Sequence, residues 1–184
     1  AAGHREPARV ASVDLRKITI GQLKGAASNE ALIGQIFAGT KYKVTYEPNM
    51  GDFLLCHAAF VLPVAFACYQ TDGDLKKLKG NIPYFDKMIE ANVEGYRAIR
   101  DSGHNILPKS DENFETDAYR KTCRRFFRLM CATGLGKICV ADHAMNAVDE
   151  MSALNRDLKE FFDKISADYP VWKELEQDAR RYLK

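Results

Sequence analysis

A nearly uninterrupted apolar stretch, residues 53–68, restricts the fold of this chain more than any other feature. An amphipathic surface helix would carry polar residues along one face, whereas here the exceptions are His57 and Pro63. The stretch is shorter than the roughly 20 apolar residues that a membrane-spanning helix needs. The mean hydropathy of the whole chain is -0.33, and no second such stretch occurs. We therefore expect a central helix over residues 49–70, buried on nearly all sides and kinked or restarted near Pro63.

The composition indicates a globular protein with a substantial core. With 184 residues, 46% of them hydrophobic, the chain suits one domain, or one domain and a fragment of another. A net charge of +2 is too small to attract nucleic acid or a membrane surface through the overall field, so neither is expected as a partner. The five cysteines form no CxxC pair, and no hydrophobic signal region begins the sequence. Reduced thiols in a cytoplasmic protein are the expectation.

The first 48 residues have the pattern of a small α/β unit. Residues 1–8 are expected to be an irregular lead-in, and two short strands on either side of Asp14–Lys17 could form a hairpin. A helix that ends at Gly39 follows, and residues 41–47 alternate as a third strand. The inward face of that helix should consist of Leu32, Ile33, Ile36 and Phe37.

Every segment after residue 48 has a helical pattern, so the predicted fold class is mainly α. A long amphipathic helix should open at Pro83 and end at Gly103, before a loop over residues 104–116. Further helices are expected over residues 115–132, 137–148 and 149–165 and after Pro170. The predicted division is residues 1–48, an α/β segment, and residues 49–184, an all-helical domain.

His57 is the sharpest candidate for chemistry, because it places a titratable group in the most apolar helix. Asp52 lies five residues earlier, too far around a helix to be a regular i, i+4 partner. A histidine in such a position can also be a core residue that hydrogen-bonds to a neighbouring helix.

His143 and Glu150 form a second candidate pair. They are seven residues apart, two helical turns, and on one helix they would share a face and could perform general acid–base chemistry in a cleft. The alternative is a helix start, at which Asp149 caps the next helix and Glu150 favours its positive end.

Other kinds of site have weaker support. Neither HExxH nor ExxH occurs, cysteine and histidine are not at zinc-ligand spacing, and no metal is expected. One face of the helix near residues 119–130 is basic, which suits an acidic partner but more often marks a solvated surface. The basic residues are Lys121, Arg124, Arg125 and Arg128. No dinucleotide fingerprint occurs in the sequence.

Two segments carry a resemblance to a known family. ITIGQL, a short helix and then KYKVTYEPNMGDFLLCHAAFVLPVAFACY resemble the junction between the two domains of the ketopantoate reductase (2-dehydropantoate 2-reductase) family. The later helices, through HAMNAVDEMSALNRDLKEFF, resemble that family's helical domain, which is like the C-terminal domain of 6-phosphogluconate dehydrogenase. The resemblance implies that residues 1–48 end an NADP-binding Rossmann domain and that residues 49–184 form a substrate and dimerisation domain.

The sequence departs from the family pattern in two respects. The glycine-rich nucleotide loop would precede Ala1, which makes the chain the expected C-terminal portion of a longer protein. The family's catalytic lysine should fall between Leu54 and His57, where no lysine occurs, and its asparagines are missing at Ala58 and Leu62. His57 could replace the lysine as proton donor to a carbonyl, with His143 or Glu150 opposite.

Two functions are therefore expected from the sequence. The first is an NADP-dependent oxidoreductase that reduces a small carbonyl substrate of the 2-oxo acid type, with this chain inactive alone. The second is a non-catalytic helical dimerisation or binding module that has lost the reductase chemistry. In both cases a homodimer is expected, because Tyr42, Val44 and Tyr46 would lie on an open strand edge. The two copies could pair through that sheet or through helix faces.

Overall fold

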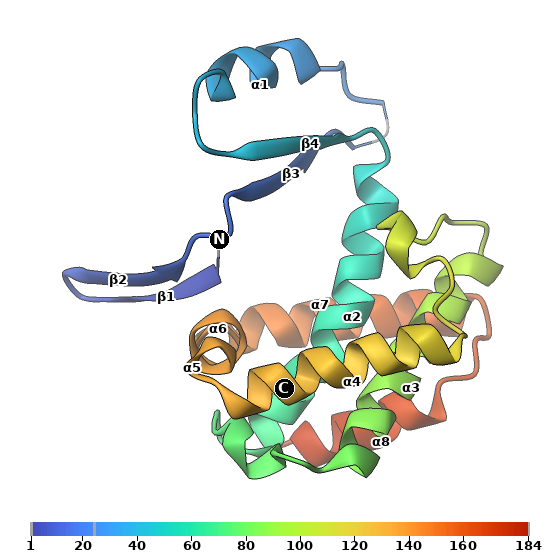
Figure 1. Ribbon diagram of the computed structural model, residues 1–184. Helices are drawn as coiled ribbons and strands as arrows, with labels where there is room; N and C mark the ends of the chain where they lie inside the picture. The colour runs from blue at the N-terminus through green and yellow to red at the C-terminus, as the bar shows by residue number, and fades with distance from the viewer. Residues whose placement is uncertain (1, 24, 184) are drawn as a thin grey trace.

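The computed structural model describes residues 2–23 and 25–183, and the chain is mainly helical, as predicted. A small α/β lobe, residues 17–47, lies at one end of a larger helical body, residues 50–179, and α2 (Met50–Gln70) runs from the junction into the body (Figure 1). A two-stranded hairpin at the start of the chain lies beside the helical body (Figure 1).

The α/β lobe is a parallel β–α–β unit. Strands β3 (Lys17–Gly21) and β4 (Lys43–Glu47) pair in parallel, and helix α1 (Glu30–Phe37) connects them. In this register Ile18 lies opposite Val44. Parallel strands cannot be joined by a tight turn, because the chain must cross back to the starting edge before the second strand.

The predicted hairpin across Asp14–Lys17 is wrong, and so is the irregular lead-in. Instead, β1 (Ala2–Glu6) pairs antiparallel with β2 (Arg9–Val13), and this hairpin contacts helix α6 and the turn before it. At the predicted turn, Arg16 has a positive φ of 51° and its N–H donates to Asp14 Oδ1. This local bond directs the chain out of β2 and into β3, whose partner comes after α1.

Only part of the predicted inward face of α1 is covered. Ile33 and Phe37 are half-buried, while Leu32 and Ile36 remain 55% and 58% exposed. A sheet of two strands is too narrow to cover the whole apolar face of a helix, so half of that face stays open to solvent.

Helix α2 is continuous through Pro63, so the predicted restart does not occur. A proline inside a helix removes the bond to the carbonyl four residues earlier, here that of Ala59. The side-chain amide of Asn92, on the neighbouring helix α3 (Ile82–Asp101), donates to that oxygen at 3.4 Å. Asn92 therefore replaces the missing bond, and Tyr119 Oη holds Asn92 by donating to its Oδ1 at 2.5 Å.

Helices of the body follow the predicted order with one correction. The segment predicted as one helix over residues 137–148 begins as a π-helix, and α6 ends at Asn146, before Ala147. The remaining elements of the body are η1 (Leu75–Leu78), η2 (Lys109–Asp111), α4 (Asp117–Ala132), α5 (Gly134–Gly136), η3 (Lys137–Ala141), α6 (Asp142–Asn146), α7 (Val148–Lys164) and α8 (Pro170–Ala179).

The core of the body lies where α2, α3, α7 and α8 meet. The fully buried Trp172 makes edge-to-face contacts with Phe66 and Phe162, and its Nε1–H donates to Asn155 Oδ1 at 3.0 Å. Gly95 lets α3 approach α2 closely, because a Cβ at this position would lie 3.1 Å from Ala59 Cβ. Such interlocked aromatic and small side chains account for the tight packing of the four helices.

Among the described helices, α2 is the one long and apolar enough to cross a bilayer. The other helices cover it, so that 56% of its apolar window is buried inside the protein. Residues 62–69 are a core segment, as predicted, but Leu54 and His57 in the first turns are exposed, so the expected burial on nearly all sides is wrong for that end of the helix.

Candidate functional site

A small hollow beside the first turns of α2 brings together an imidazole, a carboxylate and several apolar rings. Its volume is about 120 Å³, and it lies between α2, α3 and η2. The lining residues are Phe53, His57, Phe60, Tyr96, Leu107, Pro108 and Asp111. His57, the candidate from the sequence, therefore faces residues of α3 and of the loop after it.

Helical spacing explains why one wall of the hollow comes from α2. Phe53, His57 and Phe60 are separated by four and three residues, so they share one face of the helix. The rings of Phe53 and His57 are nearly parallel, 4° apart in plane and 6.3 Å between centroids. Phe60 in turn contacts Phe126 and Phe127 of α4. The imidazole is therefore set in a row of aromatic side chains.

A hydrogen-bonded pair forms the opposite wall. Tyr96 Oη donates to Asp111 Oδ2 at 3.0 Å, and Ser110 Oγ donates to Asp111 Oδ1 at 3.0 Å. Tyr96 is buried and Asp111 half-buried. Burial raises the pKa of Tyr96, and the nearby charge of Asp111 raises it further, so the phenol remains a neutral donor.

The imidazole of His57 keeps part of its surface exposed, yet its pKa is lowered. The cause is desolvation by the surrounding protein, which disfavours the charged form. Among the described residues, the imidazole contacts the ring of Phe53 and makes no hydrogen bond or ion pair. Its ring nitrogens are therefore free to exchange a proton with a small molecule.

A second titratable pair, which the sequence did not indicate, lies at the first turn of α2. The carboxylate of Asp52, 7% exposed, accepts a hydrogen bond from His104 Nδ1 at 2.7 Å. It also accepts from Asn105 N at 2.8 Å, from Asn105 Nδ2 at 2.9 Å and from Asn49 Nδ2 at 2.6 Å. We call Asn49, Asp52, His104 and Asn105 the Asp52 cluster.

The Asp52 cluster holds its carboxylate in the charged form. Burial alone would raise the pKa of Asp52, but the hydrogen bonds from Asn105, His104 and Asn49 together outweigh it and lower the pKa. The geometry also confirms that Asp52 does not partner His57, since it turns to the loop after α3 instead.

Cys56 connects the Asp52 cluster to the hollow. Its thiol donates to Asn105 O at 3.6 Å and accepts from Leu107 N at 3.4 Å. One segment, residues 104–108, is thus bound at its start by Asp52 and at its centre by Cys56, and its end lines the hollow. The loop that forms this wall is therefore fixed by side chains of α2.

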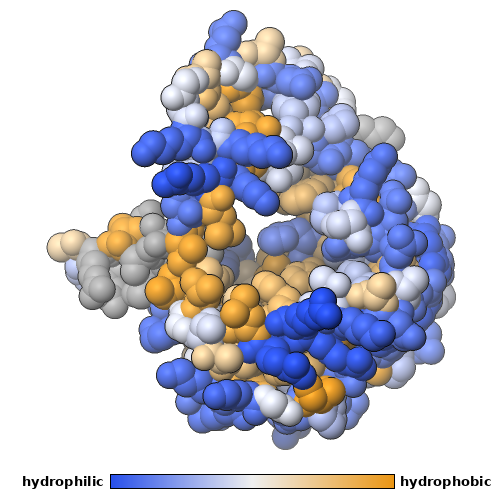
Figure 2. All heavy atoms as spheres, in the orientation of Figure 1, coloured by the Kyte–Doolittle hydropathy of each residue, from blue (hydrophilic) through white to orange (hydrophobic). Residues whose placement is uncertain are grey.

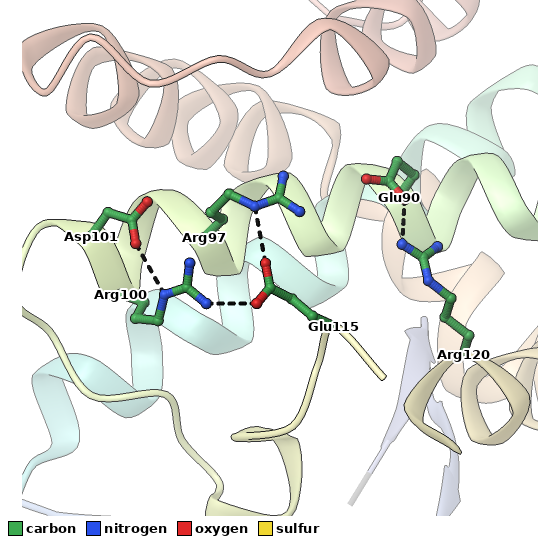
Figure 3. Close-up of polar contacts among 6 residues, drawn as sticks. All are labelled: Glu90, Arg97, Arg100, Asp101, Glu115 and Arg120. Carbon is green, nitrogen blue, oxygen red and sulfur yellow. Dashed lines mark hydrogen bonds and ion pairs between the residues drawn. The ribbon is translucent and has the colours of Figure 1, made fainter. Parts of the chain in front are cut away.

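A set of ion pairs fixes the other end of the same loop. Glu115 accepts from Arg97 Nε at 3.2 Å and from Arg100 Nη1 at 2.8 Å, both on α3 (Figure 3). Arg120 of α4 pairs with Glu90 further along α3 (Figure 3). The two pairs of Glu115 are exposed and contribute little stability individually, whereas the Arg120–Glu90 pair is half-buried. Together they hold the loop and the start of α4 against α3.

His143 and Glu150, predicted as a pair on one helix face, are on different helices. His143 is in α6, Ala147 breaks the helix, and Glu150 is in the first turn of α7. Both side chains are exposed, and among the described residues no hydrogen bond, ion pair or ring contact joins either of them to His57. The prediction of a shared face is wrong, and the first-turn position of Glu150 fits the alternative of a helix start.

Other parts of the described chain offer weaker sites. The larger hollow, about 830 Å³, is a broad surface groove between α7 and α8, and several of its charged residues already pair with one another, as Lys159 does with Glu176 and Lys164 with Glu160. No cluster of metal-ligating side chains occurs in the described residues. All five cysteines are free thiols, four of them buried, as predicted. On α4, Arg124 pairs with Asp86 of α3, and Lys121, Arg125 and Arg128 are exposed.

Comparisons with known proteins give no match. No family model matches the chain, and neither the curated proteins nor the solved structures show significant similarity to it. A function is therefore inferred from the geometry of the hollow and of the lobes around it.

Proposed function

We propose that this chain is the substrate-side part of an NADP-dependent oxidoreductase, similar to the ketopantoate reductases, that acts on a small carbonyl compound. The observation that carries the proposal is the parallel β3–α1–β4 unit, whose last strand leads within three residues into the buried helix α2. Parallel strands occur almost entirely in larger sheets with both faces covered. A two-stranded parallel unit is therefore suited to be the edge of a wider nucleotide-binding sheet.

The residues described here do not themselves fit a dinucleotide. The turn between β3 and α1 lacks the GxGxxG pattern, and Glu30 places a negative charge in the first turn of α1, where a pyrophosphate would bind. Under the proposal, the nucleotide is bound by other residues than these and supplies the hydride. The residues described here bind the carbonyl compound and supply the proton.

His57 is the proposed proton donor to the carbonyl oxygen. It lies in the wall of the hollow, and an imidazole can transfer a proton over hydrogen-bond distance to a bound oxygen. Because burial lowers its pKa below the ordinary 6.5, the protonated form that acts as an acid is populated below that lowered pKa. Carbonyl reduction should accelerate as the pH falls through it, and oxidation of the alcohol should show the opposite trend. The five free thiols suit the cytoplasmic location that the proposal includes.

Replacing His57 with glutamine should lower kcat for carbonyl reduction by about a hundredfold and remove the acid-side rise in rate. The measurement is the pH profile of NADPH oxidation by the native protein purified from its source cells. Lys76→Gln is the matched surface control, since Lys76 is exposed on η1, away from the hollow. An unchanged profile in His57→Gln would overturn the role of His57. A loss of similar size in His143→Gln would show that the two histidines act together despite lying on separate elements.

A second candidate function, a non-catalytic dimerisation or binding module, is favoured by the exposed apolar surface of the α/β lobe. Leu32 and Ile36 on α1 are exposed, and β3 and β4 pair only with each other in the described part of the chain. Figure 2 shows hydrophobic side chains in the recess between this lobe and the helical body. Surfaces of this kind commonly bind a partner.

Association through the α/β lobe should be visible by sedimentation velocity. We expect the chain to sediment as a dimer at micromolar concentration, and a double substitution, Leu32→Glu with Ile36→Glu, to shift it to the monomer. The matched control is Lys76→Glu, which also introduces a glutamate but at an exposed position of η1, outside the α/β lobe. A monomer at high concentration in the unsubstituted chain would exclude self-association as the function of this surface.

A further inference from the structure

We propose that the hollow beside His57 holds an uncharged ring or a short branched group that carries a carbonyl or alcohol, and that it rejects carboxylates. This differs from the 2-oxo acid expected from the sequence. The class of ligand is inferred from the lining alone, whereas its role as a substrate rests on the proposed function.

The volume of the hollow sets the size of the ligand. At about 30 Å³ for each water molecule, 120 Å³ corresponds to about four waters. An apolar cavity of similar size is enough to hold one benzene ring. Whole small-molecule sites are larger, about 300 Å³ or more. The hollow therefore accepts one ring or one short branched chain, and the rest of a larger molecule would project from it.

The charge around the hollow excludes an anion. Asp111 is its acidic residue, and no lysine or arginine is among the described lining residues. A second carboxylate, that of Asp52, lies near this end of α2: burial raises the pKa of the Cys56 thiol, and the charges of Asp52 and Asp111 raise it further. At pH 7, where the lowered pKa of His57 leaves its imidazole neutral, a carboxylate in the hollow would lose its water, meet the repulsion of Asp111 and find no cation to compensate.

The aromatic walls favour a planar, neutral group. Phe53, Phe60 and Tyr96 line the hollow, and aromatic pairs gain energy from edge-to-face or offset contact beyond the area they bury. The polar groups are few and placed on opposite walls, His57 on one and the Tyr96–Asp111 pair on the other. Both oxygens of Asp111 already accept a hydrogen bond, so the carboxylate does not need a cationic ligand to satisfy it. A single ligand oxygen facing His57 satisfies this arrangement.

Three probes of one shape test the inference directly. Benzyl alcohol, benzoate and benzylamine differ in charge, and their binding to the chain can be followed by NMR through the His57 imidazole and the Phe53 and Phe60 rings. We expect benzyl alcohol to bind and benzoate to bind at least about tenfold more weakly. Asp111→Asn keeps an oxygen that can accept from Tyr96 but removes the charge. It should therefore narrow the difference in affinity between benzyl alcohol and benzoate. Lys76→Gln, which is remote from the hollow, should leave it unchanged.

The outcomes separate this inference from the proposed function. Three results would each overturn the ligand class. Benzoate could bind as tightly as benzyl alcohol, benzylamine could bind more than tenfold tighter than the alcohol, or the folded chain could bind none of the probes. Selective binding of the alcohol, combined with no NADPH-dependent turnover of benzaldehyde or other carbonyls by the native protein, would support the ligand class and overturn the oxidoreductase.

Discussion

Replacing Asp52 with alanine should lower the free energy of unfolding by about 3 kcal/mol. The carboxylate is buried and accepts hydrogen bonds from His104, from Asn49 and twice from Asn105. Removing it leaves several donors in a partly dry site without an acceptor, and that desolvation cost exceeds the net strength of the lost bonds. Urea unfolding at pH 7, followed by circular dichroism, measures the difference.

The pH dependence of the Asp52→Ala effect gives a second readout. Because the folded pKa of Asp52 lies below its ordinary value of 3.8, its stabilisation is complete above that value and is lost as the pH falls through the lowered pKa. The stability difference between the two proteins should therefore shrink at low pH. Asp101→Ala, which removes an exposed ion pair with Arg100, is the matched control and should cost less than about 1 kcal/mol. Equal stability of the two variants would refute a structural role for the Asp52 cluster.

Replacing Glu94 with alanine should lower the free energy of unfolding by about 3 kcal/mol as well. Glu94 is a buried residue of α3 whose two oxygens accept from Val171 N at 3.0 Å and Trp172 N at 2.9 Å. These N–H groups belong to the first turn of α8, which has no capping side chain of its own. Alanine would leave both without an acceptor beside the core residue Trp172.

Glutamine at position 94 separates hydrogen bonding from charge. Burial raises the pKa of Glu94, and the bonds from Trp172 and Val171 only partly offset this, so ionisation disfavours the folded state. The wild type should lose stability as the pH rises from 4.5 through the raised pKa, and Glu94→Gln should not show this loss. The amide offers one acceptor oxygen instead of two. At pH 7 we therefore expect Glu94→Gln to lower the free energy of unfolding by about half as much as Glu94→Ala does. A variant Glu94→Ala as stable as the wild type would show that α8 is capped by water instead.

The sequence predicts most helices correctly because their start and end signals are local. Asn81 caps α3 by accepting from Tyr84 N, and Gly103 follows its end with a positive φ of 88°. Strand pairing is not local: the alternation of residues 17–21 indicates a strand but does not distinguish a neighbour across a turn from one beyond a helix. The hairpin error arises from this ambiguity. The predicted helix over residues 137–148 fails for a related reason, since a π-turn and the break at Ala147 leave no clear sequence signal.

The candidate site shows the same limit. The apolar surroundings of His57 are visible in the sequence, and its place beside the hollow follows from the 53, 57, 60 spacing on α2. His104 and Asp52 are 52 positions apart, and their contact depends on how α3 packs against α2. The one local signal is the sequence Gly103-His104-Asn105, polar residues directly after a helix end, and it gives no indication of a partner. Asp52 is prominent in the sequence as a neighbour of His57, which is the wrong partner.

The lining of the hollow also determines whether ligand binding there can change the orientation of the α/β lobe. Of the residues that the structure describes, the seven that line the hollow belong to α2, α3 and the segment that ends in η2, and none of these seven belongs to residues 2–47. A ligand contained in the hollow makes the same contacts for any orientation of the α/β lobe, so its coupling free energy with lobe orientation is zero. Any such coupling must come from ligand atoms that extend beyond the hollow and reach the lobe. The part of the ligand inside the hollow therefore determines its affinity, and the part outside determines whether binding is coupled to the orientation of the lobe.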